Sequence, residues 1–404
     1  MGGDVGGLRT LQVRPGHPDF LDLPWRLPLD EWPGRCERLV QVPRGLSRHP
    51  VRFVNYGAAV YALKEVPPAL AVREYDVLSV LEERRMPAVT PVGCAAVVHA
   101  DGEDAGVLVT RFLDGALPYR VLFQNPGLHR YRERLLDAIA GLLVRLHLGG
   151  FYWGDCSLSN TLFRRDAGEL QAYLVDAETS EHHEELGDGL RRQDLLILEE
   201  NVTGDLVDLE SFVELPGSLA AFETGANIRA RYEALWAEVT REETLARNEH
   251  WRIQERIRKL NELGFSVGEI EMEATGDGDR LRMRAIVTDR DYHRHQLHSA
   301  TGLLAEERQA ERMLNEIREV KATLTREANR SVPFSVAAFH WQREYWTPAL
   351  KTLAPVLATG IEPAEAYCQV LEHKWFLSER ARQDVGWAAA LADYVARFHA
   401  GPPA

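Results

Sequence analysis

The stretch WGDCSLSN, residues 153–160, contains an aspartate and an asparagine separated by four residues, Asp155 and Asn160. An aspartate in a tight loop can accept a hydrogen bond from a hydroxyl group, and an asparagine about one turn further along can direct its amide oxygen at a magnesium ion. A second stretch, YLVDAETS at 173–180, places Asp176 at the end of an apolar strand. There its carboxylate can bridge a magnesium ion and phosphate oxygens. A capped turn is the alternative explanation for Asp155 and Asn160.

Lysine is scarce in this chain, which makes its positions informative. Only five of the 47 basic residues are lysines, and Lys64 is the only lysine in the first 258 residues. It lies in the strand-like run VYALKEV, where a compact ammonium charge can hold phosphate oxygens. In the helical stretch that follows, Glu74 is better placed to pair with Lys64 than Glu82 or Glu83, which fall near the helix end. A surface lysine and an exposed helix glutamate are the alternatives.

The expected elements begin with strands and continue with helices. Five strand-like runs lie at 36–42, 51–56, 58–66, 92–100 and 105–113. A helix beginning near Ala69 separates the third run from the fourth, and a long amphipathic helix is expected at 128–150. Two short strands, TLFRR and QAYLVD, follow the WGDCSLSN stretch.

The ordered set of Lys64, Glu74, Asp155, Asn160 and Asp176 resembles the protein-kinase-like superfamily. It is most similar to minimal bacterial branches such as the lipopolysaccharide (Kdo) kinases, the RIO-type kinases and the aminoglycoside phosphotransferases. The wording GDCSLSNTLF with YLVDAETSE also resembles an uncharacterised bacterial family. That family joins a lipopolysaccharide-kinase-like domain to a C-terminal domain of unknown function.

This resemblance implies an α+β, bilobal protein-kinase-like fold followed by a C-terminal domain. Residues 36–113 would form a five-stranded antiparallel N-lobe and residues 114–228 a mostly helical C-lobe. Residues 229–404 would form a mainly helical domain that begins with a long charged helical stretch and has a β-hairpin near 269–289. Residues 1–35 are rich in proline and glycine, and we expect them to form an extended N-terminal arm.

The resemblance also implies roles for the five residues of the ordered set. Asp155 would orient the acceptor hydroxyl as the central catalytic residue, and Lys64, held by Glu74, would position the α- and β-phosphates of ATP. Asn160 and Asp176 would hold Mg²⁺. The implied cofactors are therefore ATP and Mg²⁺.

The expected nucleotide contacts differ from those of a kinase with a glycine-rich loop. The loop PRGLSRHP at 43–50 lacks the pattern G-x-G-x-x-G. Arg44, Ser47 and Arg48, with backbone N–H groups, would cover the phosphates instead. Asp114 follows the fifth strand-like run and could meet the ribose, although an Asp–Gly turn explains it equally well.

Other positions also depart from the kinase pattern. Trp153 and Gly154 precede Asp155 where a histidine is usual, and Ala177 and Glu178 replace the Phe and Gly of D-F-G. No A-P-E sequence follows, so regulation through an activation segment is not supported. Asp194 would either anchor the catalytic loop through backbone N–H groups or favour the start of its own helix.

Composition excludes several classes of function. The formal net charge of −14 argues against a general nucleic-acid binder, which would present a basic face. The four cysteines form no CxxC pair, which disfavours a disulfide framework or a zinc cluster. No apolar run reaches the ~18 residues that a membrane span needs, and the N-terminus lacks a signal-peptide pattern. We therefore expect a cytoplasmic protein.

The function that best explains this set is an ATP- and Mg²⁺-dependent phosphotransferase. The sequence leaves the hydroxyl acceptor open: a sugar, a lipid-linked sugar, a small metabolite or a protein all fit. The alternative is a pseudokinase, a nucleotide-binding or scaffolding module whose C-terminal domain binds a protein partner. The charged helices of that domain suit a homodimer or a protein partner, but solvated helices have the same composition.

Overall fold

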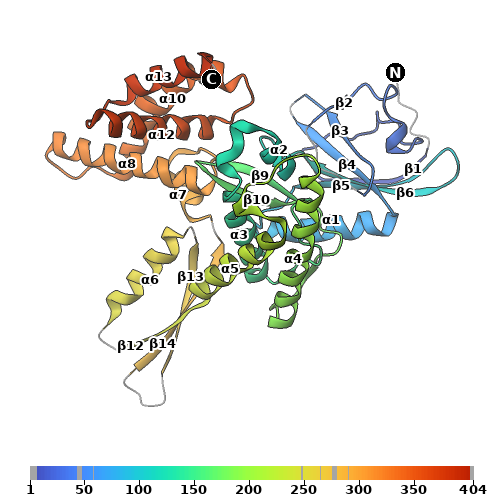
Figure 1. The fold of residues 1–404 in the computed structure, drawn as a ribbon, viewed down its shortest axis with the longest axis horizontal. Helices are drawn as coiled ribbons and strands as arrows, with labels where there is room; N and C mark the ends of the chain where they lie inside the picture. Colours follow the sequence, from blue (N-terminus) through green and yellow to red (C-terminus); the bar gives the residue numbers. More distant parts are fainter. Residues whose placement is uncertain are drawn as a thin grey trace. The chain divides into compact units, whose positions relative to one another are not determined.

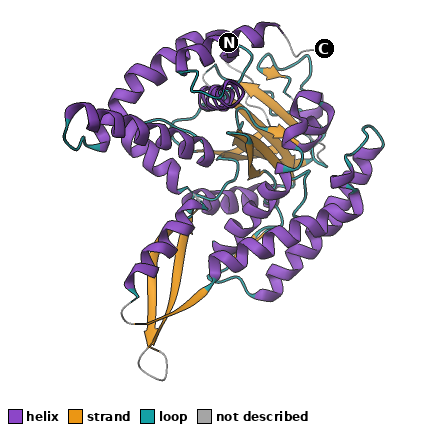
Figure 2. Ribbon diagram, turned by 60° about the vertical axis from the view of Figure 1, so that its left-hand side comes forward, coloured by secondary structure: helices purple, strands orange, loops and turns teal. Residues whose placement is uncertain are grey.

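The computed structural model describes residues 7–42, 48–57, 59–246, 249–263, 265–274, 280–289 and 291–400. The chain divides into two compact units. The first unit is formed by Met1–Arg164 with Ala172–Ala237, and the second by Arg165–Gln171 with Glu238–Ala404. Figure 1 labels the elements along the chain, and Figure 2 distinguishes the helices from the strands.

The first unit begins with a six-stranded antiparallel sheet, one strand more than the five predicted. Its strands are β1 (Leu8–Val13), β2 (Leu39–Val40), β3 (Val51–Asn55), β4 (Val60–Val66), β5 (Pro91–Val98) and β6 (Asp104–Arg111). Their order in the sheet is β1-β5-β6-β4-β3-β2. Lys64 therefore lies on β4, between the neighbouring strands β3 and β6.

The additional strand, β1, belongs to the N-terminal segment for which we predicted only an extended arm. It pairs with β5, and a Cβ atom at Gly93 would lie 2.2 Å from the carbonyl oxygen of Gln12, so the glycine permits this close approach. The register shifts between Leu8 and Thr10. This irregularity breaks the two-residue alternation that identifies a strand in a sequence, which is why the prediction was wrong here.

Helix α1 (Pro68–Glu83) packs against the sheet and carries Glu74 on its buried face. Ala71, Glu74, Tyr75, Leu78 and Leu81 are its buried residues. A Cβ atom added at Gly106 of β6 would lie 2.7 Å from the Cα of Pro68. The first turn of α1 is therefore in close contact with the strand next to β4, and this contact sets the height of Glu74 above the sheet.

The rest of the first unit is mostly helical. Its elements are β7 (Leu117–Pro118), α2 (Tyr119–Gln124), η2 (Pro126–Tyr131), α3 (Arg134–Leu148), β8 (Phe151–Tyr152), β9 (Thr161–Asp166), β10 (Glu169–Leu174), β11 (Glu181–His182), α4 (Asp188–Glu210), η3 (Gly217–Leu219) and α5 (Ala221–Thr240). Strands β7, β9 and β10 form one small sheet, and β8 pairs with β11. The loop between β8 and β9 holds Asp155 and Asn160, and β10 ends just before Asp176.

The second unit combines a three-stranded sheet with helices. Its elements are β12 (Glu242–Ala246), α6 (His250–Glu262), β13 (Ser266–Ala274), β14 (Arg280–Asp289), α7 (Tyr292–Thr301), α8 (Glu307–Ala328), α9 (Phe334–Trp341), the π-helical η4 (Gln342–Trp346), α10 (Thr347–Thr352), α11 (Ala354–Leu357), α12 (Pro363–Ala381) and α13 (Trp387–Ala400). The hairpin predicted near 269–289 corresponds to β13 and β14. Strand β12 interrupts the helical stretch that we predicted at the start of this region and pairs with β14. Such pairing depends on a partner strand distant in the sequence, which local charge patterns do not reveal.

The segment between β9 and β10 belongs to the second unit through specific contacts. Asp166 accepts hydrogen bonds from the backbone N–H groups of Arg308, at 3.1 Å, and Gln309, at 2.8 Å, in the first turn of α8. The N–H of Ala167 donates to Glu365 at 2.9 Å. The two bonds to Asp166 satisfy N–H groups of α8 that have no partner within the helix.

Of the helices in the described ranges, none combines the length and the apolar composition needed to cross a membrane.

Candidate active site

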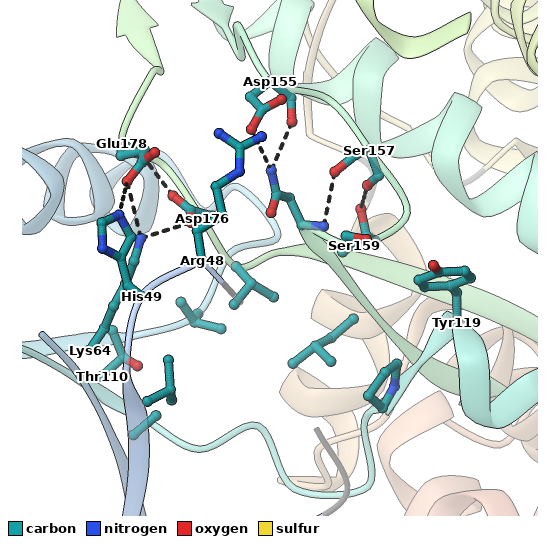
Figure 3. A pocket seen from close by; sticks show the side chains of 18 of the residues that line it. Arg48, His49, Lys64, Thr110, Tyr119, Asp155, Ser157, Ser159, Asp176 and Glu178 are labelled. Carbon is teal, nitrogen blue, oxygen red and sulfur yellow. Dashed lines mark hydrogen bonds and ion pairs between the residues drawn. The ribbon is translucent and has the colours of Figure 1, made fainter. Parts of the chain in front are cut away.

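The candidate active site is a cavity of about 770 Å³ in the first unit (Figure 3). Lys64 and Thr110 line it from the six-stranded sheet, and Asp155, Asn160 and Asp176 line it from the segments after β8 and β10. Val51, Ala62, Leu108, Leu162 and Val175 contribute apolar lining. The cavity therefore combines an apolar surface with a few convergent polar groups, as small-molecule sites do.

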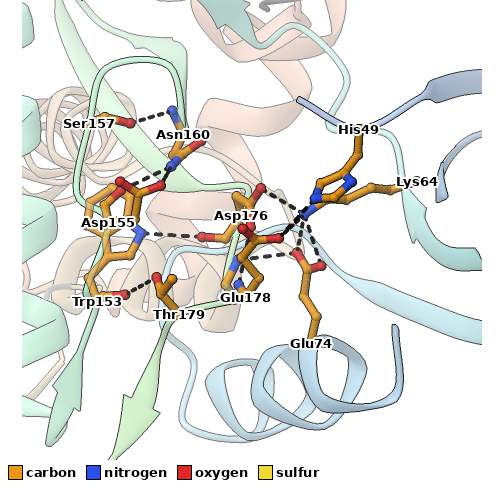
Figure 4. Close-up of polar contacts among 11 residues, drawn as sticks. His49, Lys64, Glu74, Trp153, Asp155, Ser157, Asn160, Asp176, Glu178 and Thr179 are labelled. Carbon is orange, nitrogen blue, oxygen red and sulfur yellow. Dashed lines mark hydrogen bonds and ion pairs between the residues drawn. The ribbon is translucent and has the colours of Figure 1, made fainter. Parts of the chain in front are cut away.

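The ammonium group of Lys64 lies among three carboxylates (Figure 4). Its Nζ is 2.7 Å from Asp176 Oδ2, 3.0 Å from Glu74 Oε2 and 3.5 Å from Glu178 Oε2. Burial lowers the pKa of Lys64, but the carboxylates of Glu74 and Asp176 outweigh burial, so the pKa is raised above its ordinary value. Lys64 therefore keeps its positive charge at neutral pH.

Glu74 joins helix α1 to both Lys64 and the segment after β10. Its side chain is fully buried, and its Oε1 accepts a hydrogen bond from the N–H of Ala177 at 3.3 Å. Burial raises the pKa of Glu74 to about 7, although the ammonium of Lys64 acts in the opposite direction. The pairing predicted from the sequence is thus present, and it also fixes the backbone next to Asp176.

Two asparagines hold the Asp155 carboxylate. Asn160 Nδ2 donates to Asp155 Oδ2 at 3.0 Å and to the Asp155 carbonyl oxygen at 3.0 Å. Asn201 Nδ2, from α4, donates to Asp155 Oδ1 at 2.9 Å. Each carboxylate oxygen therefore receives one amide N–H and keeps a lone pair for a further donor.

Asp194 anchors the loop that carries Asp155. It is fully buried, and it accepts hydrogen bonds from the N–H groups of Trp153, at 2.7 Å, and Gly154, at 2.8 Å. His147 Nε2 lies 3.2 Å from the same carboxylate. Of the two explanations that the sequence left open for Asp194, the structure shows the loop anchor.

The side chains beside Lys64 match the donor types that magnesium prefers. Carboxylate oxygens of Glu74, Asp176 and Glu178 lie within 4.8 Å of one another. Asn160 donates through Nδ2, which leaves its amide oxygen as a ligand atom. Hard oxygen donors of this kind suit Mg²⁺, so the side chains present fit that ion by type of donor.

The remaining predicted contacts divide into three groups. Arg48 lines the cavity, as Figure 3 shows, whereas Arg44 and Ser47 lie outside the described residues. Asp114 is exposed and is not among the residues that line the cavity. Asp114 lies in an Asp–Gly turn next to Leu113, which does line the cavity, and its contact with the ribose stays a prediction.

Three residues of the site were missed by reasoning from the sequence. Glu178 was treated only as a departure from D-F-G, and Asn201 and Asp205 of α4 were not singled out. Asp205 Oδ2 accepts the N–H groups of Leu158, at 2.9 Å, and Ser159, at 3.1 Å. The available signal lay in the spacing along α4. Leu198, Val202 and Leu206 mark its buried face, and the polar residues Asp194, Asn201 and Asp205, seven and four positions apart, fall on the same face.

A strand lysine paired with a helix glutamate, and an aspartate–asparagine loop beside a second aspartate, define a kinase-like fold and site. Residues 59–214 match the model of the lipopolysaccharide kinase (Kdo/WaaP) family, and residues 234–398 match a domain of unknown function, DUF4032. The first match is to a family of kinases, and both matches confirm the resemblance drawn from the motifs.

Many solved structures are similar to this chain. The chain is similar to a solved structure described as WaaP in complex with acyl carrier protein, with 16% sequence identity and a TM-score of 0.37. The similarity covers 63% of this chain and 98% of that chain. No curated protein matches this chain.

Proposed function

We propose that the first unit transfers the γ-phosphoryl group of ATP, with Mg²⁺, to a hydroxyl group of an acceptor. The acceptor classes are those that the sequence left open: a sugar, a lipid-linked sugar, a small metabolite or a protein. The observation that carries this proposal is the Lys64 ammonium, held between Glu74 and Asp176 in a cavity that Asp155 also lines. We also propose a cytoplasmic location and retain a homodimer or protein partner of the C-terminal region as a prediction.

Each side chain has a role that follows from its charge and contacts. Lys64 would hold oxygens of the α- and β-phosphates, and the apolar lining would receive the base and exclude water. Asp155 would accept a hydrogen bond from the acceptor hydroxyl and orient its oxygen for attack. Asn160 and Asp176, with Glu178 beside them, would hold Mg²⁺. When bound, that ion supplies positive charge to the phosphate oxygens.

Binding of Mg·ATP, measured by isothermal calorimetry, tests the nucleotide site. Loss of one charged ligand costs about 1.5–3 kcal/mol, so Asp176→Ala should weaken binding about 10- to 100-fold. Asp101→Ala is the matched control, because Asp101 is exposed in the turn between β5 and β6 and is not among the residues that line the cavity. No binding to the native chain, or equal loss in both variants, would refute the nucleotide site.

Release of ADP separates an enzyme from a binding module. We expect one of the four acceptor classes to stimulate ADP release from Mg·ATP, and Asp155→Asn to abolish the stimulated rate while Mg·ATP still binds. Tight Mg·ATP binding without ADP release from any acceptor class would instead support the pseudokinase alternative.

A further inference from the structure

One face of helix α4 follows the loop that carries Asp155. Asp194, Asn201 and Asp205 are seven and four residues apart, and side chains at such spacings share one face of a helix. All three contact the loop at 153–159. The loop thus lies along the helix, and both run in the same direction of the chain at these contacts.

The two aspartates of this face fix the backbone on either side of Asp155. Asp194 accepts the N–H groups of Trp153 and Gly154 before it, and Asp205 accepts those of Leu158 and Ser159 after it. Neither contacts the Asp155 side chain through a hydrogen bond in the described structure. The backbone contacts therefore leave the rotation of the Asp155 carboxylate to be set by other groups.

Asn201 is the residue of α4 that reaches this carboxylate. Its Nδ2 donates to Asp155 Oδ1 at 2.9 Å and to the carbonyl oxygen of Cys156 at 3.2 Å. It lines the cavity together with Asp155. One amide group thus ties the side chain of Asp155 to the backbone of the next residue.

We propose that Asn201 is a positioning residue for Asp155: it holds the carboxylate so that the lone pairs not used by the asparagines face the acceptor. The proposal rests on the proposed function, because it assigns Asp155 the hydroxyl. Asn160 alone cannot fix the carboxylate, since it bonds only Oδ2 and is also a candidate ligand of the metal. With Asn201 removed, the carboxylate gains a rotation that the reaction does not tolerate.

Two variants separate positioning from packing. Asn201→Leu removes the donor and keeps a similar volume, and Asn201→Asp keeps the shape but replaces the donor by a charged oxygen beside Asp155. We expect both to lower kcat for ADP release roughly 10- to 100-fold and to leave KM for ATP within about twofold, as loss of an aligned acid–base group does. Thr203→Ala, which removes a hydroxyl bonded within the same helix, is the control and should match the wild type.

A role in packing alone gives a different pattern. Asn201→Asp would then stay close to the wild type, because it has the same shape, and Asn201→Leu would lose thermal stability and nucleotide affinity together with kcat. That pattern would overturn the proposal. Wild-type kcat retained in Asn201→Asp would do the same.

Crystal structures of the two variants give a second readout that needs no activity. We expect the Asp155 carboxylate to rotate and its Oδ2 to lose the bond from Asn160. A carboxylate that keeps its position in both variants refutes the inference, even where turnover falls. If the wild type releases no ADP with any acceptor, the proposed function fails, and the variant structures still decide whether Asn201 positions Asp155.

Discussion

Replacing Asp194 by alanine should unfold the loop that carries Asp155. The carboxylate is fully buried and accepts two backbone N–H groups, at 2.7 and 2.8 Å, as well as a contact from His147. Burial lowers the pKa of His147, so the imidazole is neutral. Because a carboxylate only accepts, the neutral imidazole donates its Nε2 proton to Asp194, and its Nδ1 accepts from the Tyr232 hydroxyl at 2.8 Å.

The magnitude follows from the groups left without a partner. A buried donor that loses its acceptor costs about 1–3 kcal/mol, and Asp194→Ala leaves the N–H groups of Trp153 and Gly154 in that state. With the His147 contact also lost, we expect a decrease of about 3–5 kcal/mol in the free energy of unfolding, as for other broken buried networks. Asp194→Asn keeps one carbonyl oxygen and should lose about half as much.

Amide hydrogen exchange provides the assay, because it measures the stability of the loop separately from that of the second unit. The protection of the Trp153 and Gly154 amides should fall by at least ~100-fold in Asp194→Ala, given about 1.4 kcal/mol for each factor of ten. Asp188→Ala is the control, since Asp188 lies in the first turn of the same helix and is exposed. If Asp194→Ala and the control protect these amides equally, the carboxylate does not anchor the loop and the reasoning fails.

Two further predictions concern the second unit and the position of α1. Burial, followed by the charge of Glu306, raises the pKa of Asp166 from 3.8 to about 8, so the folded state binds this proton more tightly than the unfolded chain. The free energy of unfolding should therefore fall as pH rises from about 4 to about 8, by up to ~1.4 kcal/mol per pH unit. In urea titrations at pH 5 and 7.5, Asp166→Asn should show a smaller difference between the two pH values than the wild type. An equal difference in both proteins would contradict this. The Cβ atom of Gly106→Ala would lie 2.7 Å from the Cα of Pro68, so we expect a loss of about 1–3 kcal/mol and weaker Mg·ATP binding through a displaced Glu74. Gly189→Ala, which meets no atom within 4 Å, is the control for calorimetry and melting, and equal behaviour of the two variants would refute the packing argument.

Sequence reasoning succeeded where one chemical requirement fixed both a residue type and a place on an element. Lys64, Glu74 and Asp176 are far apart along the chain, yet a strand lysine, a helix glutamate and a carboxylate after a strand can meet only in one arrangement of the kinase-like fold. The structure brings these three together and also places Asp155 and Asn160 in the same cavity. The motif thus predicted which residues distant in the sequence lie together, and the periodicity of hydrophobic residues alone does not.

The elements that were missed depend on partners that no local pattern contains. Strand β1 is hidden by a register shift in a proline- and glycine-rich segment, and β12 forms only by pairing with β14. Asn201 binds the side chain of Asp155, 46 positions earlier in the chain. Asp205 accepts hydrogen bonds from backbone N–H groups, which are not specific to any type of side chain and so leave no pattern in the sequence. A polar residue on a helix face predicts that a partner exists, but the partner becomes evident only in the fold.

The two sequence departures that weighed most against a kinase meet at one point in the structure. His49 comes from the loop that lacks the G-x-G-x-x-G pattern, and Glu178 replaces the glycine of D-F-G, yet His49 Nε2 lies 3.5 Å from Glu178 Oε2. The same carboxylate oxygen lies 3.5 Å from Lys64 Nζ. Counted separately, the departures suggest two losses, but in the structure His49 and Glu178 lie side by side next to Lys64.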